Sequence, residues 1–279
     1  MLLDTDSEGM TVWHRAAKRG NLDMLQKVWD WAERKLTAEE INKLLLATDV
    51  KRRTAWNLAA KRGYLDVLQN VWELAERNLT AEEVNKLLLA TDIEGKTGWH
   101  LAADWGHLDQ LQNVWEWAEE KLTAEEINKL LVATDSEGMT VWHRAAPWGN
   151  LNVLRKVWER VKEKLTAEEI NKLLLPTDSE GRTFWYYASQ RGNLDILQNV
   201  WDFAEEKLTA EEINKLLLAT DSNGRSFWHL AAVRGKLGLL QKLRSWAEEN
   251  LTVEECNKFL LTTDSEGRTG SHLAAESAI

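Results

Sequence analysis

Cysteine, proline and long apolar runs are nearly absent from this chain, and each absence excludes a class of protein. The single cysteine, Cys256, excludes a disulfide framework and any multi-thiolate zinc or iron–sulfur site, and it is typical of a reducing, cytoplasmic location. Only 2 prolines occur in 279 residues, which favours helices joined by short turns. No apolar run approaches the roughly 18 residues that a membrane span needs, and the opening residues, MLLD, are not a secretion signal. We therefore expect no membrane partner.

Phenylalanine and tyrosine are also scarce, with 4 and 3 copies, whereas tryptophan occurs 16 times. Charged residues make up 29% of the chain, and 45 acidic against 35 basic side chains give a formal net charge of -10. A hydrophobic fraction of 44% is enough for a sizeable core in a chain of this length. The acidic excess argues against nucleic acid as a partner.

The most informative feature is a repeat of 43 residues that runs through the chain without an insertion or deletion. One aspartate and one tryptophan mark the repeats: Asp6, Asp49, Asp92, Asp135, Asp178, Asp221 and Asp264; Trp13, Trp56, Trp99, Trp142, Trp185 and Trp228. No linker and no change of composition interrupts the series. We therefore expect a single repeat domain over residues 1–279, with about six and a half repeats that begin near residues 6, 49, 92, 135, 178, 221 and 264.

Each repeat is predicted to hold three helices, which makes the fold class all-α. In the first repeat, one helix covers about residues 11–19, a second covers residues 22–35, and a third begins after Thr37. Thr11 is a plausible N-cap of the first helix, and a capping box between Thr37 and the glutamate three residues later opens the third.

The turn between repeats ends in glycine in every repeat except the second, where Arg52 takes its place. Glycine is favoured there if the backbone needs a positive φ, a conformation that costs other residues about 1–2 kcal/mol. Arg52 is therefore predicted to be a site of local strain.

The stretch DSEGMTVWHRAAKRGNL, residues 6–22, resembles the first half of an ankyrin repeat, D-x-x-G-x-T-P-L-H-x-A-A-x-x-G-x-L. Here the proline position holds other residues, the first leucine is tryptophan, and the repeat is about ten residues longer than an ankyrin repeat. We interpret the extra length as a third helix in the loop region. Whether the family's β-hairpin is retained stays open. The alternative is a HEAT-like helical solenoid, which fits the length but not the motif.

The ends of the chain carry one further expectation. The sequence begins within a third helix and stops after a first helix, so we expect a piece of a longer array. Framework changes such as Pro176 for Ala47 favour recent gene duplication over an engineered binder, although both readings stay open.

The polar clusters are interpreted as structural. Histidine recurs at the His14 position of five repeats, and the ankyrin resemblance implies that it fastens the turn by hydrogen bonding. The Glu39-Glu40 pairs lie in the first turn of a helix, where their charge interacts favourably with the helix dipole. Cys256 occupies an isoleucine or valine position and is expected in the core. Because no cluster is singular, we expect no enzyme activity, no metal and no cofactor.

The tryptophans divide by their position in the repeat. Those at the Trp13 and Trp29 positions recur in nearly every repeat and are interpreted as filler between helices. A third position holds Trp31, Trp117 and Trp246 but leucine, arginine or phenylalanine elsewhere, which predicts a half-exposed site.

Trp105 and Trp148 stand where four other repeats have arginine, near the end of the first helix. We predict that they are exposed and contribute strongly to partner binding. Packing against the neighbouring repeat is the alternative.

Variation between repeats is concentrated in the turn and the first helix, which line the concave, partner-binding face in ankyrin arrays. The resemblance therefore implies partner contacts at Met10, Arg15, Lys18, Arg19, Arg53, Leu58, Lys61, Arg62, Lys96, Leu101, Asp104, Trp105, Met139, Arg144, Trp148, Arg182, Tyr187, Gln190, Arg191, Arg225 and Arg234. Most of these residues are basic, so we expect a protein partner with an acidic patch and salt-sensitive association. The alternative is that nearby glutamates, such as Glu8 and Glu94, neutralise much of the strip.

The chain is thus predicted to be a monomeric, non-catalytic protein-interaction module. Two other functions remain open: a structural spacer within a larger repeat protein, and a binder of polyanions or nucleic acid through the basic strip.

Overall fold

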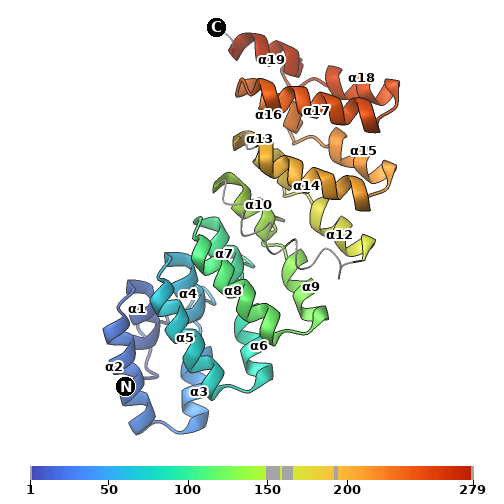
Figure 1. Cartoon of the computed structure of the whole chain (residues 1–279). Helices are drawn as coiled ribbons and strands as arrows, with labels where there is room; N and C mark the ends of the chain where they lie inside the picture. The colour runs from blue at the N-terminus through green and yellow to red at the C-terminus, as the bar shows by residue number, and fades with distance from the viewer. Residues whose placement is uncertain (1, 149–157, 159–165, 192–193, 278–279) are drawn as a thin grey trace. The chain divides into compact units, whose positions relative to one another are not determined.

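The computed structural model describes residues 2–148, 158, 166–191 and 194–277, and within these ranges the regular structure is helical (Figure 1). The only β-type pairings in the described residues are two isolated bridges, Thr177 with Thr183 and Thr263 with Thr269. The predicted all-α repeat architecture is confirmed, with three helices in the repeats that are described in full; the second helix expected in the fourth repeat lies outside the described residues. The ankyrin β-hairpin survives as a tight turn.

The chain divides into two compact units, Met1–Ser136 and Glu137–Ile279. The first unit holds three complete repeats, and the second begins with the turn of the fourth. The expectation of one continuous domain stays a prediction.

The first helix of each repeat is short and follows the turn directly. These helices are α1 Val12–Arg19, α4 Ala55–Arg62 and α7 Gly98–Asp104 in the first unit, and α10 Val141–Ala145, α13 Phe184–Arg191, α16 Phe227–Val233 and α19 Gly270–Ser277 in the second; a 3-10 turn, η1 Ala146–Trp148, follows α10. The predicted caps are confirmed in α1. The Thr11 side chain accepts from the backbone N–H of His14, and Gly20 ends the helix in the left-handed conformation with φ 67°.

The second helices are the longest elements. They are α2 Leu22–Lys35, α5 Leu65–Asn78, α8 Leu108–Lys121, α14 Leu194–Lys207 and α17 Leu237–Asn250. In the first, second, third and fifth repeats the first helix packs on the second through an indole pair, whereas the sixth repeat has Arg244 at the second position. The ring centroids of Trp13 and Trp29 are 5.8 Å apart, and those of Trp99 and Trp115 are 5.4 Å apart. The described tryptophans at these two positions are all buried, as predicted.

The third helices are α3 Ala38–Leu46, α6 Ala81–Leu89, α9 Ala124–Val132, α12 Ala167–Leu174, α15 Ala210–Leu218 and α18 Val253–Leu261. Each begins with the predicted capping box. In α3, the Thr37 hydroxyl accepts from the Glu40 N–H, and the Glu40 carboxylate accepts from the Thr37 N–H at 2.8 Å. The Glu39–Glu40 type of pair is therefore a helix start and not an acid/base pair.

Within each unit, consecutive repeats stack helix on equivalent helix. In the first unit α4 lies between α1 and α7, and in the second α16 lies between α13 and α19 (Figure 1). The stacking affects how far the tryptophans at the third position, Trp31, Trp117 and Trp246, are buried. Trp117 lies against Trp72 of the preceding repeat with ring centroids 5.0 Å apart, and Trp246 lies against Trp201 at 4.5 Å.

The prediction of a half-exposed site holds for Trp31 and Trp117 but not for Trp246. Trp246 is 1% exposed, Trp117 is half-buried, and Trp31 is 49% exposed. The two tryptophans that stack on an indole of the preceding repeat are more buried than Trp31, and the residue type alone does not reveal which indoles meet.

Two smaller expectations have clear outcomes. Arg52 has φ 57°, the only described residue other than glycine with a positive φ, so the predicted local strain is located there. Cys256 is half-buried and not fully in the core. Cys256 lies near the start of α18 and is more exposed than the equivalent residue of α3, Ile41, which is 8% exposed.

Candidate protein-binding surface

The turn that opens each repeat, here called the finger, is built around its aspartate. In the second repeat, one carboxylate oxygen of Asp49 accepts from the N–H groups of Lys51 and Arg53, both at 2.9 Å, and the other accepts from the Arg53 guanidinium at 2.6 Å. Burial raises the pKa of Asp49, but the hydrogen bonds from Arg53 and Lys51 outweigh it and hold the pKa below its ordinary value. The finger is thus held closed by a charged carboxylate.

Neighbouring fingers are joined by single backbone hydrogen bonds. In the first unit, the Val50 N–H donates to the Glu8 carbonyl at 3.0 Å, and the Ile93 N–H donates to the Lys51 carbonyl at 3.0 Å. In the second unit, Ser179 donates to Glu137 in the same way at 2.7 Å. Successive fingers therefore lie side by side within a unit, and their side chains form one surface with the first helices.

Histidine joins the start of the first helix to the end of the third helix of the same repeat in the first, third and fourth repeats. In the first repeat, His14 Nδ1 accepts from the Thr11 N–H at 3.2 Å, so Nε2 carries the proton and donates to the Ala47 carbonyl at 2.9 Å. Burial lowers the pKa of His14, which keeps the ring neutral. In the second repeat Asn57 makes the equivalent hydrogen bonds. Its amide oxygen accepts from the Thr54 N–H, and its amide nitrogen donates to the Ala90 carbonyl at 3.3 Å. The structural interpretation of these histidines is confirmed.

The tyrosine that replaces this histidine in the fifth repeat reaches a different partner. The Tyr186 hydroxyl donates to the buried carboxylate of Asp221 at 2.7 Å, and burial, reinforced by Asp221, raises the pKa of Tyr186. The next residue, Tyr187, was expected on the binding surface. Its hydroxyl donates to Asp178 at 2.6 Å and its ring lies under the Arg182 guanidinium at 5.2 Å, so this half-buried side chain supports the finger.

Many of the basic residues expected on the surface are paired with carboxylates of their own finger. Arg15 lies 2.6 Å from Asp6, Lys18 lies 3.3 Å from Glu8, and Arg53 pairs with Asp49. The remaining pairs join Lys96 to Glu94 and Asp104, Arg144 to Glu137, Arg182 to Asp178 and Glu180, and Arg225 to Asp221. The alternative interpretation, that nearby acidic residues neutralise the basic strip, therefore holds for much of it.

Four apolar residues and one lysine expected to face a partner lie inside the repeats. Met10, Leu58 and Leu101 are at most 2% exposed, and Met139 and Lys96 are both 7% exposed. Burial removes these side chains from the surface available to a partner. They support the surface and do not form it.

The exposed members of the predicted set lie mainly at the ends of the first helices. Trp105 and Trp148 are 51% and 49% exposed. Trp105 belongs to the first unit, where the Lys61 ammonium lies 6.0 Å from its ring centroid, and Trp148 belongs to the second unit. Arg19, Arg62 and Arg234 are also exposed; the side chains of Gln190 and Arg191 lie outside the described residues.

Sequence reasoning missed two exposed residues on adjacent fingertips. Val50 is 64% exposed and Ile93 is 55% exposed, at a position where the other repeats have serine. It also missed the finger residue Lys51, which stands where the first and third repeats have Glu8 and Glu94. Aligning the repeats by the 43-residue step is the signal that identifies all three.

A ladder of hydrogen bonds between third helices was also missed. Asn42 donates to the capping carboxylate of Glu83 at 3.2 Å, and Asn85 donates to that of Glu126 at 3.0 Å. In the second unit Asn214 donates to Glu255 at 2.7 Å. This ladder joins the third helix of one repeat to that of the next.

The described residues hold no group of three His, Cys, Asp or Glu side chains arranged to bind a metal ion. Among the helices that the structure describes, none has the length and apolar character required to cross a membrane.

Comparisons with known proteins identify the fold. No protein-family model matches the chain, and no curated protein matches it. Among solved structures, the ankyrin repeat domain of Bcl-3, described as a unique member of the IkappaB protein family, is similar with a TM-score of 0.56 and 18% sequence identity. The similarity covers 96% of this chain and 95% of the Bcl-3 domain. The chain therefore has the ankyrin-repeat fold, in a form whose 43-residue repeats carry a third helix.

Proposed function

We propose that this chain is a non-catalytic protein-interaction module whose partner contacts the surface formed by the fingers and first helices. The observation that carries the proposal is that some parts of the repeat stay constant along the chain while others vary. The caps, the Thr–His brackets and the indole pairs recur from repeat to repeat, whereas the exposed residues at the ends of the first helices differ. A constant framework with a varied face is what selective recognition requires.

The side chains exposed on this face are suited to protein recognition. Trp105, Trp148, Arg19, Arg62 and Arg234 are tryptophan and arginine, two residue types that dominate binding energy in protein interfaces. Val50 and Ile93 add apolar contact at the fingertips. Protein similarity also supports this class of function, because the matched structure is an ankyrin repeat domain.

The partner is expected to carry an acidic patch, and the chain is expected to act as a monomer in a reducing, cytoplasmic compartment. The ion pairing of most finger cations supports a protein over nucleic acid, because a long polyanion needs a continuous run of available charge. Cys256, the only cysteine, is compatible with a reducing compartment.

The test is an affinity capture from cell extract, read by quantitative mass spectrometry, with the full chain and a triple variant, Trp105→Ala, Trp148→Ala and Arg62→Ala. All three residues are exposed, so the variant should retain the helical circular dichroism of the parent. We expect at least tenfold less of the specific partner with the triple variant.

Trp31→Ala with Met24→Ala is the matched control, since Trp31 is as exposed as Trp148 but lies on the second helix α2. The proposal is wrong if the control loses the partner and the triple variant keeps it.

A further inference from the structure

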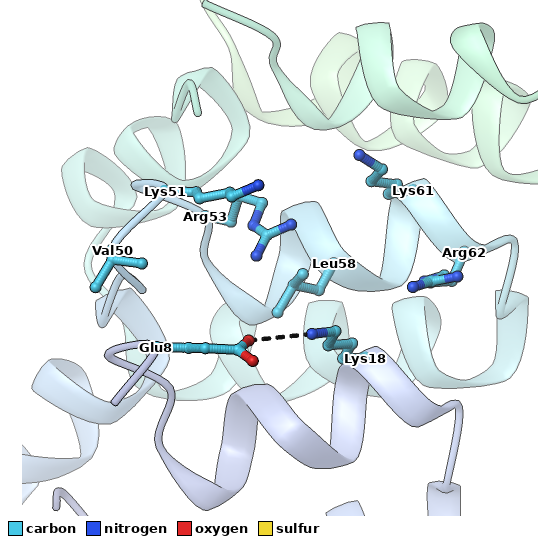
Figure 2. Close-up of a pocket in the computed structure, with 8 residues that line it drawn as sticks. All are labelled: Glu8, Lys18, Val50, Lys51, Arg53, Leu58, Lys61 and Arg62. Atoms are coloured by element: carbon cyan, nitrogen blue, oxygen red, sulfur yellow. Dashed lines mark hydrogen bonds and ion pairs between the residues drawn. The ribbon is translucent and has the colours of Figure 1, made fainter. Parts of the chain in front are cut away.

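A basic hollow of 330 Å³ lies in the first unit, between the fingers and first helices of the first two repeats. Figure 2 shows its lining: Lys51 and Arg53 come from the second finger, Lys61 and Arg62 come from the end of α4, and Leu58 lies between them. Glu8 and Lys18 of the first repeat close one side, joined by an ion pair of 3.3 Å.

The charge of this hollow is not neutralised as it is on the neighbouring fingers. Lys18 is paired with Glu8 and Arg53 is paired with Asp49, which leaves Lys51, Lys61 and Arg62 without a carboxylate partner among the described residues. The second finger lacks the neutralising acid because lysine occupies that position. The hollow therefore keeps three positive charges at its rim.

Apolar surface lies beside these charges. Leu58 is buried and forms the floor, and Val50, which also lines the hollow, is 64% exposed. Ile93, 55% exposed, is on the next finger, whose backbone is hydrogen-bonded to Lys51. A ligand that fills the hollow thus meets cations and aliphatic side chains together.

We propose that this hollow binds an acidic segment of a partner protein, in which carboxylates flank an aliphatic residue. The carboxylates pair with Lys51, Lys61 and Arg62, and the aliphatic residue packs on Val50 and Leu58. Such ion pairs are stronger in a partly enclosed site than in open water, because the effective dielectric constant is lower there. The inference rests on the proposed function, because the hollow is part of the same finger surface.

Nucleic acid fits this site less well than an acidic peptide. Two cations outside the hollow, Arg15 and Lys96, are paired with acidic residues, so they add little charge that a long polyanion could use. The chain as a whole carries a formal charge of -10, which repels a long polyanion. A short acidic segment needs only the local charge.

The test measures binding of a fluorescein-labelled peptide in which glutamates flank a central valine, by fluorescence polarisation with the full chain. Lys51→Glu introduces the residue that the first and third repeats already have at this position, so it should fold. We expect it to weaken binding about tenfold, and we expect binding to decrease as salt is raised. Lys27→Glu, on α2 and outside the hollow, is the control with the same change of charge and should stay within about twofold of the parent.

A carbodiimide reaction then locates the site, because it joins a peptide carboxylate to a nearby lysine amine. Cross-links at Lys51 and Lys61 support the proposal. Equal binding by Lys51→Glu and the parent, or by a peptide with glutamine in place of glutamate, refutes it. Displacement of the peptide by an oligonucleotide of equal affinity refutes it in favour of a polyanion site.

The position of the cross-links separates this proposal from the broader one. Binding that falls with Trp148→Ala, on the finger surface but outside the hollow, and not with Lys51→Glu refutes the hollow but leaves the finger surface as the binding face. Cross-links confined to Lys27, Lys43 and Lys86, on the second and third helices, refute both.

Discussion

At the scale of single residues, the second repeat departs furthest from the pattern of the others. Its finger reads Lys51-Arg52-Arg53 where the first reads Glu8-Gly9-Met10, so one acid and one glycine are lost together. Arg52 takes φ 57° because the Asp49 turn requires the left-handed conformation whichever residue stands there. The repeat tolerates this strain while gaining the charge that distinguishes its surface.

Arg52→Gly should stabilise the chain by about 0.5–1 kcal/mol. Relief of the left-handed strain outweighs the extra conformational entropy that glycine adds to the unfolded chain. The free energy of unfolding from a guanidinium titration checks this value. Lys51→Gly, at the neighbouring exposed position without a positive φ, should give no gain; equal stabilisation by both variants would contradict the explanation.

His14→Asn should reduce the loss of stability on acidification. Burial lowers the folded-state pKa of His14, so between that pKa and the ordinary value of 6.5 the unfolded chain binds a proton that the folded chain does not. Stability therefore falls as pH falls below 6.5, and rises again with pH until the unfolded ring is neutral. Asparagine keeps both hydrogen bonds, as Asn57 shows, but does not titrate.

The measurement is the free energy of unfolding at several pH values between 5 and 8, for the parent and the variant. The reverse change, Asn57→His, should steepen the same dependence. If stability changes with pH by the same amount in all three proteins, the residue at the His14 position does not control proton uptake on unfolding.

At the scale of elements, the third helix explains why the repeat is longer than an ordinary ankyrin repeat. Its capping glutamate closes its own first turn and accepts a hydrogen bond from the asparagine of the preceding third helix. The same carboxylate thus caps the start of one helix and joins that helix to its neighbour. Because the third helix makes both sets of hydrogen bonds, we expect its sequence to vary little between repeats.

A double-mutant cycle on Asn85 and Glu126 measures this link. Asn85→Ala removes the 3.0 Å hydrogen bond to Glu126, and Glu126→Ala removes both the bond and the capping box. Because the pair is only partly buried, the coupling energy should be modest, about 0.5 kcal/mol. The pair Asn85 and Glu125 is the control: Glu125 forms an ion pair with Lys129 instead, so its coupling to Asn85 should be near zero.

At the scale of the whole molecule, contacts between adjacent repeats add to the packing within each repeat, as in other stacked arrays. Trp117 on Trp72 and Trp246 on Trp201 are such contacts, each crossing from one repeat to the one before it. The same stacking places finger beside finger within a unit and so produces a surface on which several repeats act together. The hollow beside Lys51 exists only because two repeats meet there.

The comparison of repeats predicts much of the fold and part of the surface. The repeat boundaries, the helix caps, the strain at Arg52 and the exposure of Trp105 and Trp148 all follow from residue patterns. The surface set was less well predicted: residues such as Met10 and Leu58 are buried, and fingertip residues such as Val50 were not recognised. Variation between repeats identifies a face but does not tell which of its side chains point outward.

The sequence by itself determined the repeat, its three helices and their caps, because these depend on residues three or four positions apart. The Thr37–Glu40 box and the Gly20 end of α1 are local in this sense. Only the tertiary structure decided which indoles are covered, which cations are paired and where the basic hollow lies. Those properties depend on which side chains of the next repeat, some 43 residues away, lie opposite each residue. The sequence pattern does not show which side chains meet across that separation.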